Sequence, residues 1–158
     1  MVAAAEAWER GFTNPIPTPR PRRRVAVVAC MDARLPLFQI LGLAEGDAHL
    51  IRNAGGVVTD DVIRSLAISQ RSLGTREIVL IHHTDCGLQK INEREFRAAL
   101  QAETGMAPTW STEAFTDVDD DVRNSIRRVR TNPFIPHRDN VRGFVYEVET
   151  GRLREVEA

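Results

Sequence analysis

The run RVAVVAC at residues 24–30 constrains the fold most, because it is rich in β-branched residues and almost continuously apolar. A strand of this kind needs cover on both faces, which is typical of a parallel sheet packed between layers of helices. EIVLIHH at 77–83 repeats the pattern, and AHLIRNAGG at 48–56 predicts a further strand that runs into a turn. Helical patterns separate these strands, so the order β-α-β-α-β predicts an α/β fold with a central, mostly parallel sheet flanked by helices.

Helices and a hairpin are expected around these strands. TDDVIRSLAISQRSLG at 59–74 has apolar residues three and four apart, a cap at Thr59 or Asp60, and a glycine at its end. The alternating segment RGFVYEVETGRLREVE at 142–157 predicts a C-terminal β-hairpin. Further helices are expected at 3–10, 35–43, 92–103 and 119–130.

The 158 residues suffice for a single α/β domain, predicted at 24–158 and preceded by an N-terminal arm at 1–23. Within the arm, GFTNPIPTPRP at 11–21 contains four prolines, which favour an extended segment. Trp8 and Phe12 either dock on a partner surface, such as another copy of the chain, or belong to a loosely ordered tail.

Charge and hydropathy exclude two classes of partner. The formal net charge is −1, and PRPRRR at 19–24 is the one basic run, so we expect no nucleic-acid partner. The longest apolar run is far shorter than the roughly 20 residues needed to cross a bilayer, and no signal-peptide pattern is present, so we expect no membrane association. A cytoplasmic location follows, where thiols stay reduced. There Cys30 and Cys86 favour metal binding or catalysis over one disulfide.

Both cysteines lie at or just after the carboxyl end of a predicted buried strand, where open parallel sheets bind ligands. His83 and Cys86 have His-x-x-Cys spacing, which lets one tight turn direct both side chains at an ion. Thiolate and imidazole suit zinc, and the three donors Cys30, His83 and Cys86 leave a fourth tetrahedral position open. His82 competes with His83, but strand alternation turns only one of them to the site and the spacing favours His83. The alternative is that both cysteines simply fill the core.

Asp32 and Arg34 alternate with Cys30, so in extended backbone all three side chains point the same way. Arg34 can hold Asp32 in a two-pronged, charge-assisted pair. Asp32 then accepts a hydrogen bond from hydroxide on the metal. Released from Arg34, Asp32 would instead bind the metal and block water.

Cys-x-Asp-x-Arg at 30–34, followed by His-x-x-Cys at 83–86, resembles the β-class carbonic anhydrases, most closely their short prokaryotic branch. The resemblance runs from about residue 24 to 151. It implies an enzyme that reversibly hydrates CO2 to bicarbonate by zinc-bound hydroxide, with one Zn2+ per chain. It also implies a homodimer or higher homo-oligomer with the active site near the subunit interface.

By the same resemblance each site residue receives a role. The metal ligands implied are Cys30, His83, Cys86 and, in the closed state, Asp32. The catalytic pair implied is Asp32 and Arg34.

Other functions stay open beside this one. Hydrolysis of carbonyl sulfide or carbon disulfide would use the same zinc ligands, and pocket width and access would discriminate it from CO2 hydration. A non-catalytic zinc-binding module or a thiol redox sensor belongs to a different class. Neither of these needs a paired Asp32 and Arg34, which argues against both.

Overall fold

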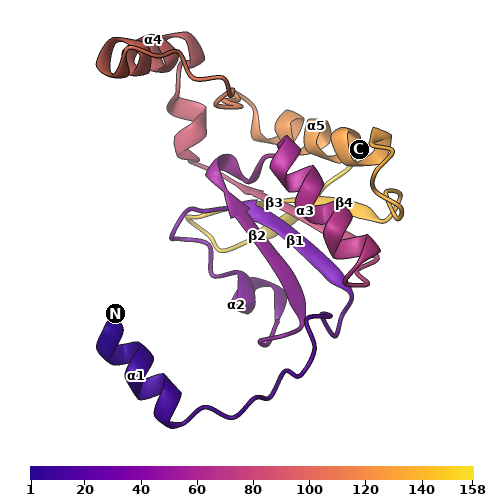
Figure 1. Ribbon diagram of the computed structural model, residues 1–158. Coiled ribbons are helices and arrows are strands. Elements are labelled where there is room, and N and C mark those ends of the chain that lie inside the picture. Colours follow the sequence, from indigo (N-terminus) through magenta and orange to yellow (C-terminus); the bar gives the residue numbers. More distant parts are fainter.

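A computed structural model describes residues 1–158, with a five-stranded sheet at the centre in the order β2-β1-β3-β4-β5 (Figure 1). The strands are β1 (Val25–Cys30), β2 (Ala48–Asn53), β3 (Glu77–His83), β4 (Val141–Tyr146) and β5 (Leu153–Val156). β2, β1, β3 and β4 pair in parallel, and β5 pairs antiparallel with β4. The predicted mostly parallel α/β sheet and its C-terminal hairpin are confirmed.

All five predicted helices form, and a side chain caps the N-terminus of three of them. They are α1 (Val2–Arg10), α2 (Leu37–Leu41), α3 (Asp60–Arg71), α4 (Glu93–Thr104) and α5 (Val118–Thr131), with short 3-10 helices η1 (Ala54–Gly56) and η2 (Gly87–Lys90). Thr59 caps α3 by accepting the N–H of Val62, and Asp117 caps α5. α2 is shorter than predicted because Gly42 takes a left-handed conformation, with φ of 57°, and ends the helix.

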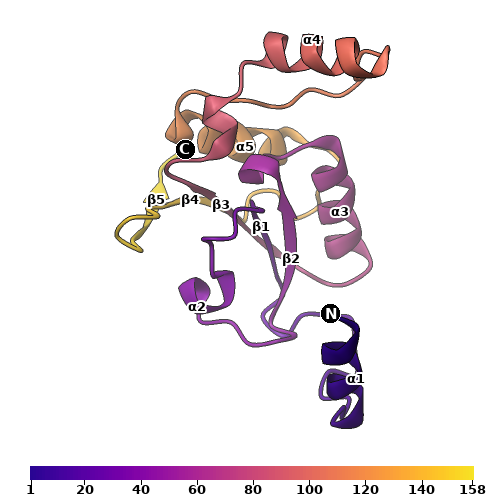
Figure 2. The ribbon, with the colours of Figure 1, turned by 90° about the vertical axis from the view of Figure 1, so that its left-hand side faces the viewer.

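The two faces of the sheet are covered unequally. α3 and α5 lie on one face, where Leu66 and Ile126 pack against Val28 and Leu80 of the strands (Figures 1 and 2). α2 lies on the other face and covers it only in part, so that Val79 there is half-buried. Burial from both sides explains why β1 is apolar at every position, since each buried aliphatic side chain contributes about 1.5–3 kcal/mol.

Two helices project from this body, α1 at one end and α4 at the other (Figures 1 and 2). Neither contains a buried residue. Trp8 and Phe12 are 63% and 55% exposed, and their rings lie 6.3 Å apart. The apolar side chains of α1 therefore lack cover within a single chain. No helix has both the length and the apolar character needed to cross a membrane.

Candidate metal centre

Cys30, His83 and Cys86 come together at the carboxyl end of the parallel strands. Cys30 ends β1 and His83 ends β3, and these neighbouring strands pair in register, with Ala29 opposite Ile81. The three ligand atoms all lie within 4.8 Å of one another, and all three residues are buried. Both cysteines are free thiols. Two sulfurs and one imidazole at this separation can hold a metal ion.

The two neighbouring histidines face opposite sides of the sheet. His83 Nδ1 lies 2.9 Å from the carbonyl oxygen of Thr84, to which it donates in the tautomer that leaves Nε2 as an acceptor. Nε2 is buried without a hydrogen-bond partner and lies 3.8 Å from Asp32 Oδ2. His82 instead faces α5, where its Nδ1 is 3.0 Å from Asp121 Oδ2. A carbonyl-oriented imidazole with an orphaned second nitrogen fits a zinc ligand.

The electrostatics of the donor set favour a cation. The hydrogen bond from Cys86, helped by His83, lowers the pKa of Cys30 to about 4 against the effect of burial. The same contact with Cys30, together with burial, raises the pKa of Cys86. Burial lowers the pKa of His83, but the Cys30 sulfur, the Thr84 carbonyl and Asp32 together outweigh it, so the pKa is raised. Metal binding would displace these protons.

Arg34 joins the turn after β1 to the turn after β3. Its Nε and Nη2 donate to the two carboxylate oxygens of Asp32 at 3.0 and 2.8 Å. Its Nη1 donates to Asp85 Oδ2 at 2.9 Å, and Lys90 Nζ donates to the other oxygen of Asp85 at 2.7 Å. Hydrogen bonding by Arg34 holds the pKa of Asp32 well below its usual range, and Lys90 followed by Arg34 lowers that of Asp85. Charges of alternating sign therefore fix the carboxylate beside the donor set.

Sequence reasoning missed two residues of this network, Asp85 and Arg52. Asp85 lies inside the His-x-x-Cys turn and adopts a left-handed backbone, with φ of 54°. Arg52, near the end of β2, donates to the carbonyl oxygens of Cys30 at 2.9 Å, Asp32 at 2.6 Å and Leu35 at 3.4 Å. A lone charge at the carboxyl end of an apolar strand was the available indication for Arg52. Through these bonds Arg52 holds the backbone of the turn that carries Asp32.

The glycine turn of η1 lies directly against the strands that carry the donors. A Cβ at Gly56 would lie 2.7 Å from the backbone nitrogen of Cys30 and 2.9 Å from the carbonyl oxygen of Ile81. Gly56 also has a φ of +73°, which favours glycine. Both the turn and the close approach therefore require glycine at position 56. The segment NAGGVV at 53–58 thus packs beside Cys30.

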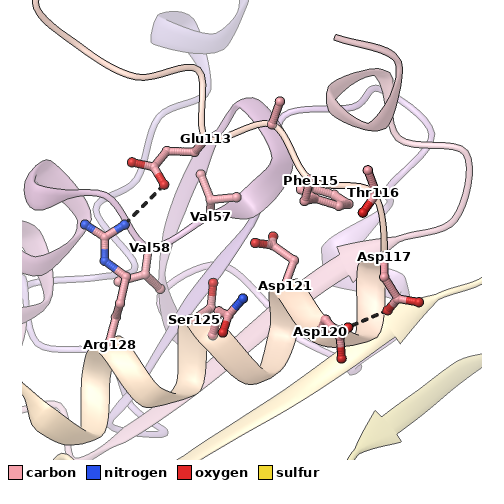
Figure 3. A pocket seen from close by; sticks show the side chains of 12 residues that line it. Val57, Val58, Glu113, Phe115, Thr116, Asp117, Asp120, Asp121, Ser125 and Arg128 are labelled. Carbon is pink, nitrogen blue, oxygen red and sulfur yellow. Dashed lines mark hydrogen bonds and ion pairs between the residues drawn. The ribbon is translucent and has the colours of Figure 1, made fainter. Parts of the chain in front are cut away.

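A separate cavity of about 410 Å³ opens on the α5 side of the sheet (Figure 3). Val57 and Val58 form one wall and α5 the other, with Asp121 pointing into the space between them and Phe115. Arg128 crosses part of it to reach Glu113. None of the three metal donors lines this cavity, so it is distinct from the candidate metal centre.

Comparison with known proteins agrees with this geometry. The sequence model of a family described as carbonic anhydrase matches residues 25–153. β-Carbonic anhydrase 1 of Mycobacterium tuberculosis is 58% identical over 149 residues, which cover 94% of this chain and 91% of that protein. The crystal structure of carbonic anhydrase from Streptococcus mutans has a TM-score of 0.88 at 44% identity, covering 99% of this chain and 94% of that chain. A carbon disulfide hydrolase of Acidithiobacillus thiooxidans is more distant, 37% identical over 153 residues, with 84% of this chain and 76% of that protein covered. The chain therefore belongs to the carbonic anhydrase family, and within it to the β class.

Proposed function

We propose that this chain catalyses the reversible hydration of CO2 to bicarbonate at one zinc ion held by Cys30, His83 and Cys86. The buried Cys-His-Cys donor set carries the proposal, because three protein donors leave a coordination position for substrate chemistry. Zinc in such a site acts as a Lewis acid and brings the pKa of a bound water toward neutrality. The two free thiols support a cytoplasmic location, where cysteines stay reduced.

The protein residues around the donor set orient the reaction. The Thr84 carbonyl fixes the His83 tautomer so that Nε2 faces the site. Arg34 keeps Asp32 ionised and holds it in place. This carboxylate can then accept a hydrogen bond from the O–H of the attacking oxygen, which would turn the lone pair of that oxygen toward CO2. Asp32 Oδ2 lies 3.8 Å from His83 Nε2, so without the Arg34 contacts Asp32 would be free to act as a fourth ligand and close the site.

Hydrolysis of carbon disulfide or carbonyl sulfide is the second candidate, supported by the similarity to carbon disulfide hydrolases. It would use the same donors. The 58% identity to β-carbonic anhydrase 1 exceeds the 37% identity to carbon disulfide hydrolase and favours CO2.

We also propose that the chain forms a homodimer or a higher homo-oligomer through its N-terminal arm. α1 buries none of its residues in its own chain, and Trp8 and Phe12 stay exposed. A second copy of the chain would supply the missing apolar cover for this helix.

The purified protein should contain about one zinc per chain and hydrate CO2 faster than it hydrolyses carbonyl sulfide in the same preparation.

The variants Cys86→Ser and Cys30→Ser should lose the metal and have a lower midpoint of urea unfolding, because metal binding is coupled to folding. His82→Asn, on the opposite face of β3, is the control and should keep its zinc. Full metal retention in both cysteine variants would rule out the ligand assignment.

Arg34→Ala should retain zinc but lose about 10–100-fold in CO2 hydration, because Asp32 is freed to compete for the open position. Asp32→Asn should also retain zinc, since three donors remain.

The CO2 hydration activity of the parent should rise with pH. Asp32 is not the group that titrates in this rise, because Arg34 depresses its pKa and keeps it ionised. The absorption spectrum of the cobalt-substituted parent should change with pH, whereas that of Asp32→Asn should change less, because only ionisation of the bound water remains. An Arg34→Ala variant with the parent rate at every pH would reduce the pair to a structural salt bridge.

Asp85→Asn should lower CO2 hydration less than Arg34→Ala does, because Arg34 keeps both bonds to Asp32 and its bond to the backbone carbonyl of Asp85, and loses only its ion pair with the Asp85 side chain. Zinc should also dissociate faster into a chelator, since the turns that carry Cys30 and Cys86 then lack the ion pair between Arg34 and Asp85 and are joined only by the backbone bond. Asp61→Asn is the matched control, as it breaks an arginine pair on the surface of α3. If both variants lost zinc at the parent rate, Asp85 would have no positioning role.

Deleting residues 1–18 should weaken self-association, which sedimentation velocity at micromolar concentration measures. Trp8→Glu should act in the same direction, because it places a charge on the apolar side of α1, whereas Glu6→Gln should leave association unchanged. A full-length protein that sediments as a monomer would contradict the proposed assembly.

A further inference from the structure

A second polar cavity lies at the amino end of the parallel strands, opposite to the metal centre. Its volume of about 460 Å³ is within the range of small-molecule sites. Its walls come from the segment before β1, the turn between α3 and β3, and the loop before β4. Its lining contains no carboxylate and four arginines, Arg20, Arg22, Arg24 and Arg76.

Three of these arginines have no partner for their charge. Arg22 forms an ion pair with Asp47 at 2.9 Å, but the guanidinium groups of Arg20, Arg24 and Arg76 have neither an ion pair nor a hydrogen-bond acceptor. The backbones of two of them adjoin, since the N–H of Arg76 donates to the carbonyl oxygen of Arg24 at 2.7 Å, and both residues line the cavity. An anion in the cavity would therefore be attracted by more than one unpaired positive charge.

Gln70 adds a buried donor to the same wall. The residue is only 6% exposed, and its Oε1 accepts the backbone N–H of His137 at 2.8 Å. Its Nε2 is buried without a partner. A buried donor without an acceptor is costly, so the cavity combines unpaired guanidinium groups with an unsatisfied amide. Both kinds of group donate hydrogen bonds, which oxyanions accept.

We propose that this cavity binds the phosphate group of a small phosphorylated molecule. Guanidinium groups match phosphate oxygens in a bidentate manner, and three unpaired positive charges favour a dianion over the monoanion bicarbonate. The cavity is large enough to take an organic portion beyond the phosphate. None of its lining residues belongs to the metal centre, so the site is independent of the proposed CO2 chemistry.

Isothermal titration of the zinc-loaded, full-length protein at low ionic strength tests the site, with inorganic phosphate, ribose 5-phosphate, ribose and bicarbonate as separate ligands. Both phosphates should bind and ribose should not, with bicarbonate weaker than either phosphate. Arg24→Gln combined with Arg76→Gln should weaken phosphate binding by roughly tenfold or more, through the loss of two charged donors, and leave CO2 hydration unchanged. Absent phosphate binding, or bicarbonate binding as tight as phosphate, would overturn the proposal.

Two controls separate this site from other sources of anion binding. Arg94→Gln combined with Arg152→Gln removes two other guanidinium groups that have no partner, and this variant should bind phosphate as the parent does. An equal loss there would show a general charge effect and overturn the proposal. Phosphate binding should also persist in the metal-free protein. If phosphate binding were lost on metal removal but retained by the Arg24→Gln and Arg76→Gln double variant, the anion would bind at zinc instead and the proposal would be overturned. Gln70→Met should weaken phosphate binding severalfold. This variant provides the test if the Arg24→Gln and Arg76→Gln double variant does not fold.

Discussion

The parallel, in-register pairing of β1 with β3 is the interaction on which the candidate metal centre depends. Because these neighbouring strands run the same way and end at the same level, Cys30 and His83 meet although about fifty residues of chain separate them. An antiparallel pair would place them at opposite ends of the sheet. The apolar run of β1 makes this pairing possible, since it can be buried by α3 and α5 on one face and by the α2 side on the other.

The turn that carries Asp32 is irregular, so side chains hold it where a ladder of backbone hydrogen bonds cannot. Arg52 binds its carbonyl oxygens from β2, and Arg34 ties it to Asp85 across the site. Contacts within the chain thus hold the candidate ligands and the carboxylate in one arrangement. Such preorganisation restricts each functional group to one arrangement, which favours orientation of a small and nearly featureless substrate such as CO2.

The sheet, the helices and the Cys30, His83 and Cys86 cluster could be predicted because each rests on local periodicity or on the meeting of strand ends. Asp85 and the arginine-lined cavity could not, since they depend on how turns far apart in sequence face one another. Cross-loop contacts of this kind leave no fixed spacing in the chain. The end of α2 was also missed by about two residues, because the left-handed conformation of Gly42 is decided locally and apolar spacing does not report it.

Lys90 has a consequence for protein chemistry. It is the sole lysine of the chain, its side chain is 70% exposed, and it completes the ion-pair series that begins at Asp32. Apart from the terminal amine, the side chain of Lys90 is therefore the one primary amine that an acylating reagent can modify. Coupling the protein to a dye or a solid support through lysine would therefore attach it at the rim of its own metal centre and remove the positive charge that faces Asp85.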